Sequence, residues 1–143
     1  ILIRIYITHP MYNYHMASQT LLLTYVLFVF FVFVHTLEEI SCDVFSLSLP
    51  GGHQIGKNRY LFGATLMTTL NLGTLALLIT GLPAGFYLGL FTSAVIGVLQ
   101  AGVHAVGFIR AGGKMRGLGA GFYSALPLAL VGATVFVRIL SEM

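Results

Sequence analysis

The sequence predicts an all-α fold: a polytopic membrane protein folded as a four-helix transmembrane bundle. Of its 143 residues, 57% are hydrophobic and only 8% are charged. A soluble domain averages about 25% charged residues, so water is not the main solvent of this chain. The third observation is a set of four apolar runs, each long enough at about 1.5 Å per residue to cross the hydrocarbon core.

The four runs are separated by polar segments or by glycine and proline. They cover residues 18–40, 60–80, 84–109 and, approximately, 119–140. Gly81-Leu82-Pro83 forms a tight turn between the second and third runs, which predicts that these two helices are antiparallel neighbours. Pro127 predicts a kink in the fourth helix, because proline lacks the backbone N–H of a helix interior.

Small residues recur at every fourth position of the third and fourth runs. In the third run they are Gly85, Gly89, Ser93, Gly97, Ala101 and Ala105, and in the fourth they are Gly117, Gly121, Ala125, Ala129 and Ala133. Such rows let helix backbones approach closely inside a membrane. We therefore expect the third and fourth helices to be in closest contact.

The chain divides into an N-terminal arm, residues 1–17, and a single four-helix domain, residues 18–143. The arm alternates isoleucine with other residues, which is a weak strand pattern. Met16 resembles a natural start, so the preceding residues are either a non-native upstream extension or an arm that binds a partner. The single cysteine, Cys42, excludes an internal disulfide.

The basic residues predict the orientation of the chain. Lys57, Arg59, Arg110, Lys114 and Arg116 lie in the first and third loops, against Arg4 and Arg138 on the opposite side. By the positive-inside rule those two loops face the cytoplasm, and both termini lie outside. The net charge of +3 is too small and too dispersed for a nucleic-acid surface, so we expect no nucleic-acid partner.

Three ionisable residues lie together at the end of the first run, in His35-Thr36-Leu37-Glu38-Glu39. At about 100° per residue, His35, Glu38 and Glu39 share one face of a helix. Each charged group at membrane depth needs a partner, a proton or a cation. This face is therefore predicted to be a functional site.

His104 lies about five residues before the end of the third run, as His35 does in the first, and Gln100 lies one turn earlier. Both helices end at the same side of the membrane, so an equal number of residues before the helix end places both histidines at the same depth. We therefore predict one site in which His35, Glu38, Glu39 and His104 are the metal ligands, with Glu38, Glu39 and His104 as catalytic groups. Gln100, Asn71 and Arg110 are expected around it, although interhelical hydrogen bonding is the commoner role of an intramembrane Asn.

These residues resemble a family. His35-Thr36-Leu37-Glu38-Glu39 is similar to the signature of the HXXEE-domain family, small bacterial membrane proteins with four or five predicted spans. Its second motif, Asn-Ala-x-x-His, corresponds here to residues 100–104 with Gln100 in place of Asn, and its His-x-x-x-Arg motif is stretched between His104 and Arg110. Ala120-Gly121 stands where relatives carry Pro-Gly. The resemblance implies a multi-pass protein of the bacterial inner membrane and candidate site residues, without a reaction.

Two classes of function remain open from the sequence. The first is an intramembrane enzyme on an apolar or lipid-like substrate, using either iron, manganese or zinc or, without metal, a buried Glu beside His as acid and base. The second is a non-catalytic accessory or pigment-binding subunit of a larger membrane complex or homo-oligomer, in which a histidine ligates haem or chlorophyll. A proton or cation conductor is a weaker third reading, because four spans leave little room for a pathway.

Overall fold

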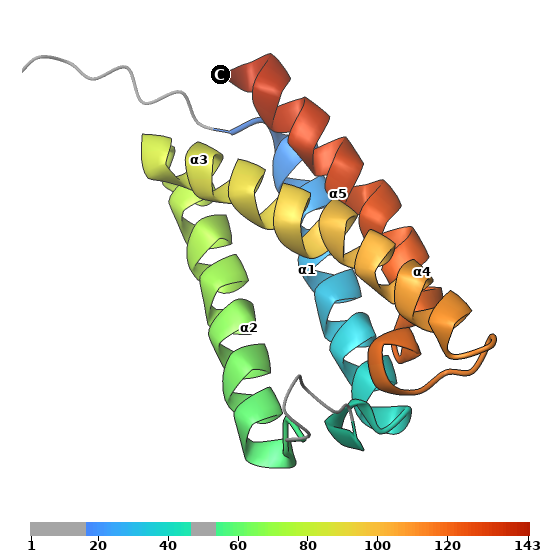
Figure 1. Cartoon of the computed structure of the whole chain (residues 1–143). Coiled ribbons are helices and arrows are strands. Elements are labelled where there is room, and N and C mark those ends of the chain that lie inside the picture. Colours follow the sequence, from blue (N-terminus) through green and yellow to red (C-terminus); the bar gives the residue numbers. More distant parts are fainter. Residues whose placement is uncertain (1–16, 47–53) are drawn as a thin grey trace, which may run out of the picture.

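A computed structural model describes residues 17–46 and 54–143, most of which are helical (Figure 1). The predicted all-α class is confirmed. Nearly all of the N-terminal arm, together with His53 in the first loop, lies outside the described residues.

Four helical spans make up the bundle. They are α1 (Gln19–Ser41), α2 (Lys57–Ile79), a third span made of α3 (Pro83–Thr92), η2 (Ser93–Leu99) and α4 (Gln100–Arg110), and α5 (Phe122–Glu142). Two single 3₁₀ turns, η1 (Val44–Ser46) and η3 (Gly117–Gly119), follow α1 and precede α5. Each of the four spans is long and apolar enough to cross a membrane, which is consistent with a multi-pass membrane protein.

Large apolar side chains cover the outside of the bundle as well as its core. Tyr25 and Phe28 of α1 are fully buried, whereas Phe30 is 57% exposed and Ile109 75% exposed. A soluble domain would not leave so many large apolar groups in water. A lipid bilayer is the solvent that suits this surface.

The antiparallel helices α1 and α5 cap each other through two glutamates. At one end, Glu142 accepts hydrogen bonds from the backbone N–H of Ser18 at 2.8 Å and from its hydroxyl at 2.5 Å. At the other end, Glu38 accepts hydrogen bonds from the backbone N–H of Ser124 at 2.7 Å and of Tyr123 at 3.3 Å. Each carboxylate thus lies at the positive end of the partner helix, where negative charge is stabilising.

The third and fourth spans make the most extensive contact in the bundle, as the small residues predict. A Cβ added to Gly97 would lie 3.0 Å from the Cα of Gly132 and 3.1 Å from the ring of Phe28. The predicted row in the fourth span is wrong at three positions. Gly132 makes the close approach while its neighbour Ala133 is exposed, Gly121 precedes α5 and lies against His35, and Gly117 lies in η3.

The third span changes its winding where it crosses α5. Residues 93–99 form a π-helix, a wider turn with i→i+5 hydrogen bonds, between α-helical segments on either side. Gly97 lies inside this segment, and Gln100 is the first residue after it. The π segment therefore sets the face that α4 presents to the rest of the bundle.

Asn71 belongs to a polar cluster in the middle of the bundle. The Tyr25 hydroxyl donates to the Asn71 side-chain oxygen at 3.2 Å and lies 2.9 Å from the Thr92 hydroxyl, and all three residues are fully buried. Their hydrogen bonds join α1, α2 and α3. Tyr25 is ten residues before His35, about 15 Å along α1, so Asn71 acts as a link between helices and lies far from His35.

Replacing Gly97 with Leu is expected to destabilise the bundle, because the new side chain would separate the two spans at their closest approach. The loss should be about 2 kcal/mol or more, as for overpacking in a close-packed interior. Gly102→Leu is the matched control, because a Cβ at Gly102 meets nothing within 4 Å. Thermal unfolding in detergent tests this: equal midpoints for the two variants would contradict the close contact.

Candidate functional site

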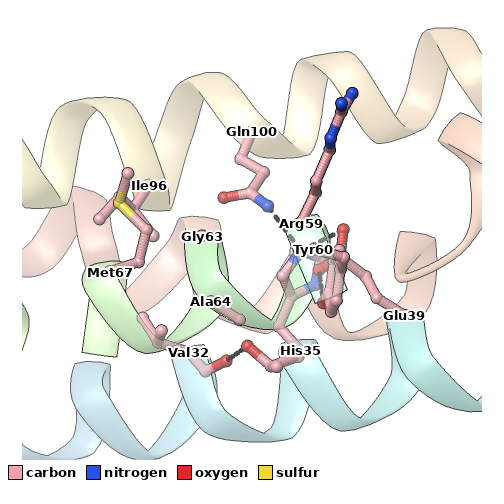
Figure 2. A pocket seen from close by; sticks show the side chains of 11 residues that line it. Val32, His35, Glu39, Arg59, Tyr60, Gly63, Ala64, Met67, Ile96 and Gln100 are labelled. Carbon is pink, nitrogen blue, oxygen red and sulfur yellow. Dashed lines mark hydrogen bonds and ion pairs between the residues drawn. The ribbon is translucent and has the colours of Figure 1, made fainter. Parts of the chain in front are cut away.

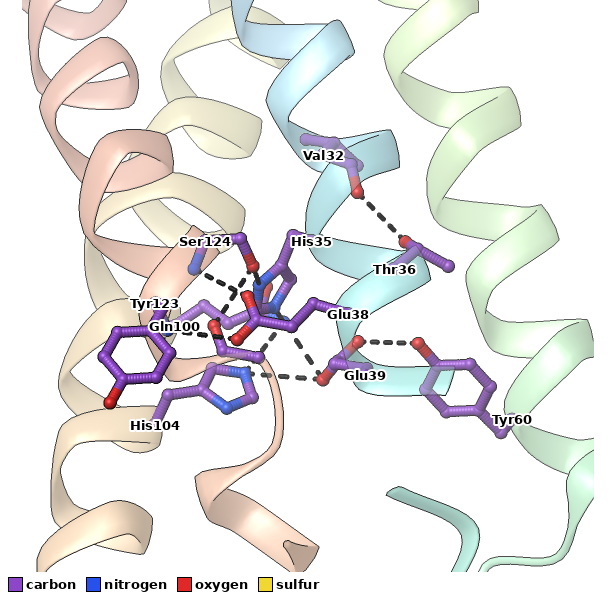
Figure 3. A network of polar contacts seen from close by, with 11 residues as sticks. Val32, His35, Thr36, Glu38, Glu39, Tyr60, Gln100, His104, Tyr123 and Ser124 are labelled. Carbon is purple, nitrogen blue, oxygen red and sulfur yellow. Dashed lines mark hydrogen bonds and ion pairs between the residues drawn. The ribbon is translucent and has the colours of Figure 1, made fainter. Parts of the chain in front are cut away.

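Three ionisable side chains converge at the end of the bundle where α1 and α4 finish (Figure 3). His35 and Glu39 are one turn apart on α1, and His104 is on α4; they are 2%, 8% and 4% exposed. Oε1 of Glu39 lies 3.7 Å from Nε2 of His35 and 3.4 Å from Nε2 of His104. One nitrogen or oxygen atom from each residue lies within 4.8 Å of the other two.

Gly121 lets the start of α5 approach these side chains closely. Its φ of +84° is in the left-handed region, which favours glycine. A Cβ added there would lie 2.6 Å from Cε1 of His35 and 2.8 Å from Cγ of Glu39. The turn before α5 therefore forms one wall of the cluster, and a larger residue at position 121 would displace it.

Hydrogen bonds orient the His35 ring. The amide nitrogen of Gln100 lies 2.9 Å from Nε2 of His35 and 3.4 Å from Nε2 of His104. Because an amide nitrogen only donates, both Nε2 atoms direct their lone pairs toward the same small region. His35 then donates from Nδ1 to the Ser124 hydroxyl at 2.9 Å, and that hydroxyl donates to the Gly121 carbonyl at 3.2 Å.

Tyr60 holds the other oxygen of the Glu39 carboxylate. Its hydroxyl donates to Oε2 of Glu39 at 2.6 Å, and its ring packs edge-on against Phe45 of η1 with centroids 5.2 Å apart. This bond brings the start of α2 to the cluster and leaves Oε1 of Glu39 facing the histidines. A short, charge-assisted hydrogen bond of this kind fixes the carboxylate strongly.

Glu38 is placed apart from these three residues. Its carboxylate lies at the N-terminus of α5, bound to the N–H groups of residues 123 and 124 as described above. Of the four residues expected from the sequence to be metal ligands, the structure therefore brings together three, His35, Glu39 and His104. Glu38 contributes by fixing α5, and with it Ser124 and Gly121, beside His35.

Two further residues expected around the site do not reach it. Arg110 is exposed at the last turn of α4, six residues or about 9 Å of helix beyond His104. Asn71 lies in the separate cluster with Tyr25. Gln100 does contact both histidines. Tyr60 and Ser124 also belong to the site and were not predicted from the sequence. A single hydroxyl residue in an apolar helix has no sequence pattern that marks it as part of a site.

Two cavities flank the cluster. One, of about 270 Å³, runs between α1, α2 and the third span and is lined by His35, Glu39, Tyr60 and Gln100 among others (Figure 2). The second, of about 380 Å³, reaches His104 and shares Glu39, Tyr60 and Gln100 with the first. The Glu39 carboxylate and the Gln100 amide therefore lie between two open spaces.

Two imidazoles and one carboxylate form a donor set that suits divalent iron, manganese or zinc. Bonds of about 2.1 Å to one ion place neighbouring ligand atoms about 3.0 to 3.4 Å apart in octahedral or tetrahedral geometry. The separations of 3.4 and 3.7 Å around Oε1 of Glu39 lie at or just above this range. Three protein ligands would also leave coordination positions open, as in catalytic metal sites.

The fold and the cluster together define an all-α protein of four membrane-length helices with a buried two-histidine, one-carboxylate group near one end of the bundle. Comparison of the chain with protein-family models, with curated proteins and with solved structures found no match. The resemblance to the HXXEE-domain family therefore stays a prediction carried by the motif residues.

The variant Glu38→Gln separates the role of Glu38 from that of its neighbour. The amide keeps an oxygen acceptor for the α5 N-terminus but loses the charge, so unfolding should become easier by about 0.5 to 1 kcal/mol. Metal content after purification should match that of the unchanged protein. Loss of metal from Glu38→Gln without loss of stability would instead make Glu38 a ligand.

Proposed function

We propose that this protein is a metal-dependent membrane enzyme that binds one divalent transition-metal ion through His35, Glu39 and His104. The observation that carries the proposal is the convergence of Nε2 of both histidines and Oε1 of Glu39 in one buried place. The ion is iron, manganese or zinc. The substrate is apolar or lipid-like.

Electrostatics supports a bound cation. A carboxylate buried in an apolar bundle loses its hydration, which costs several kcal/mol unless a charge or hydrogen bonds replace the water. Tyr60 satisfies one oxygen of Glu39, and the other faces the two imidazoles. A divalent ion between them would balance the carboxylate and use both nitrogen lone pairs.

Gln100 is the residue that must adjust when the ion binds. Its amide nitrogen lies near both Nε2 atoms, in the region that a cation would occupy. A half-turn of the amide group would replace the donor with the carbonyl oxygen, which is an acceptable ligand for a divalent ion. Gln100 would then become a fourth ligand or a hydrogen-bond acceptor for metal-bound water.

The cavities support a substrate drawn from the bilayer. Both adjoin Glu39, and each has apolar side chains beside the polar ones, including Met67 and Ile96 in one and Val95 and Leu99 in the other. The open coordination positions would face these spaces. The metal would act there as a Lewis acid on the bound substrate or on water.

Two alternatives stay open beside this proposal. Without metal, Glu39 and His104 could serve as an acid and base pair on the same substrate, and activity in metal-free protein would favour that chemistry. As an accessory or pigment-binding subunit, the protein would show the visible absorption of haem or chlorophyll. Residence in a bacterial inner membrane with both termini outside is likewise proposed from the motif and the loop charges.

Removing one ligand is expected to abolish metal binding. Protein purified from metal-supplemented medium should carry about one metal equivalent. Glu39→Gln and His104→Ala should each weaken metal binding by about a hundredfold or more, which exceeds the usual effect of replacing a residue that only hydrogen-bonds to a ligand. Glu38→Gln is the neighbouring control for Glu39→Gln. Elemental analysis measures the content, and circular dichroism checks the fold.

The proposal would be wrong if the unchanged protein carried no metal, or if Glu39→Gln and His104→Ala kept a full equivalent while folded. Metal-free protein that turned over substrate would point to the acid–base alternative.

A further inference from the structure

The cavity between α1, α2 and the third span has a polar end and an apolar end. Arg59 and Tyr60 lie at one end beside Glu39, and Met67, Val32 and Ile96 line the other (Figure 2). From position 59 to position 67 along α2 is about 12 Å. The cavity therefore has the length and polarity gradient of an amphiphile that lies along the helix.

The cavity lies where α2 separates from the third span. α2 packs against α3 and α1, but among the described residues it makes little contact with η2 or α4, and the two diverge in Figure 1. Met67 at the cavity rim is 41% exposed. The opening between α2 and the third span would face lipid, so a chain can enter from the membrane without crossing water.

Small residues create this space. Gly63 and Ala64 line the middle of the cavity, and a Cβ added to Gly63 would meet nothing within 4 Å. The volume of about 270 Å³ holds roughly nine water-sized groups at about 30 Å³ each. That is enough for part of one alkyl or prenyl chain and too little for a two-chain lipid.

Charge selects the head of the amphiphile. Arg59 lines the polar end and is exposed, and Lys57 is exposed one turn away from Tyr60 at the start of α2. Glu39 is the acidic residue that lines this cavity, and Tyr60 already binds one of its oxygens. A guanidinium group pairs well with a carboxylate or a phosphate.

We propose that this cavity binds a single-chain anionic amphiphile, with its carboxylate or phosphate head at Arg59 and its chain running past Gly63 toward Met67. This arrangement places the carbons next to the head beside His35 and Glu39, which line the same cavity. It rests on the proposed function for the reaction, because it names the substrate class of that site. Binding itself does not require the metal.

A photoreactive fatty acid tests the proposal on the full chain in detergent. The probe is a palmitic-acid analogue with a diazirine in mid-chain, which should label residues of α1, α2 or η2 that line the cavity. Palmitate and hexadecyl phosphate are the two anionic competitors, and hexadecanol is the neutral one. Competition by one anion alone would identify the head, and competition by both would define the shared negative charge.

Two substitutions probe the two ends. Gly63→Leu should fill the cavity and weaken labelling by about a hundredfold, as expected for several methylenes kept out of an apolar site. Gly73→Leu is the matched control on the same helix, because a Cβ there also meets nothing within 4 Å. Arg59→Gln should weaken competition by the anions about tenfold, the value of one charge-assisted hydrogen bond, and leave hexadecanol unchanged.

The proposal is overturned if hexadecanol competes as well as the anions, or if folded Gly63→Leu is labelled like the unchanged protein. Ala64→Leu fills the same cavity and replaces Gly63→Leu if that variant does not fold. Metal content measured in the same samples separates the two proposals. If the protein is labelled but carries no metal, the amphiphile site stands and the metal enzyme is ruled out. If it carries metal but is not labelled, the metal site stands and the amphiphile site is ruled out.

Discussion

The burial of the Glu39 carboxylate inside an apolar bundle is the constraint on which this structure depends. A buried carboxylate must be compensated, and four helices contribute to that task. Tyr60 of α2 donates a hydrogen bond to one oxygen of Glu39, and His35 and His104 face the other. Because Gly121 has no side chain, the start of α5 can pack directly against the cluster. Glu39 thus connects α2 to the bundle through Tyr60 and lies between the two histidines.

The other two glutamates join α1 to α5. Glu38 and Glu142 each lie near the C-terminal end of one helix and cap the N-terminus of the other, so α1 and α5 are locked in register at both ends. This pairing aligns His35 with Ser124 at the start of α5. Adjacent residues of one motif therefore divide the work: Glu38 positions a helix, and Glu39 faces the candidate metal site.

Periodicity and depth could predict much of this arrangement from the sequence. The apolar runs correctly located all four spans. The equal distances of His35 and His104 from their helix ends predicted that the two residues lie close together, and in the structure their ring centroids are 4.7 Å apart. The helical spacing of about 100° per residue could not distinguish the roles of Glu38 and Glu39. Both residues lie on the same side of the helix as His35, so both were compatible with one metal site. The π-helix at residues 93–99 and the role of Tyr60 depend on packing between distant segments, which no local pattern encodes.

X-ray absorption at the metal edge of the purified, metal-loaded protein is the direct test of a site made by His35, Glu39 and His104, because it reports the ligands of the ion itself. We expect nitrogen and oxygen ligands at about 2.1 Å from the ion, with the outer-shell scattering of two imidazole rings. His104→Ala should reduce that signal to one ring. A first shell without imidazole, or one unchanged by loss of His104, would contradict the assignment of His35, Glu39 and His104 as a metal site.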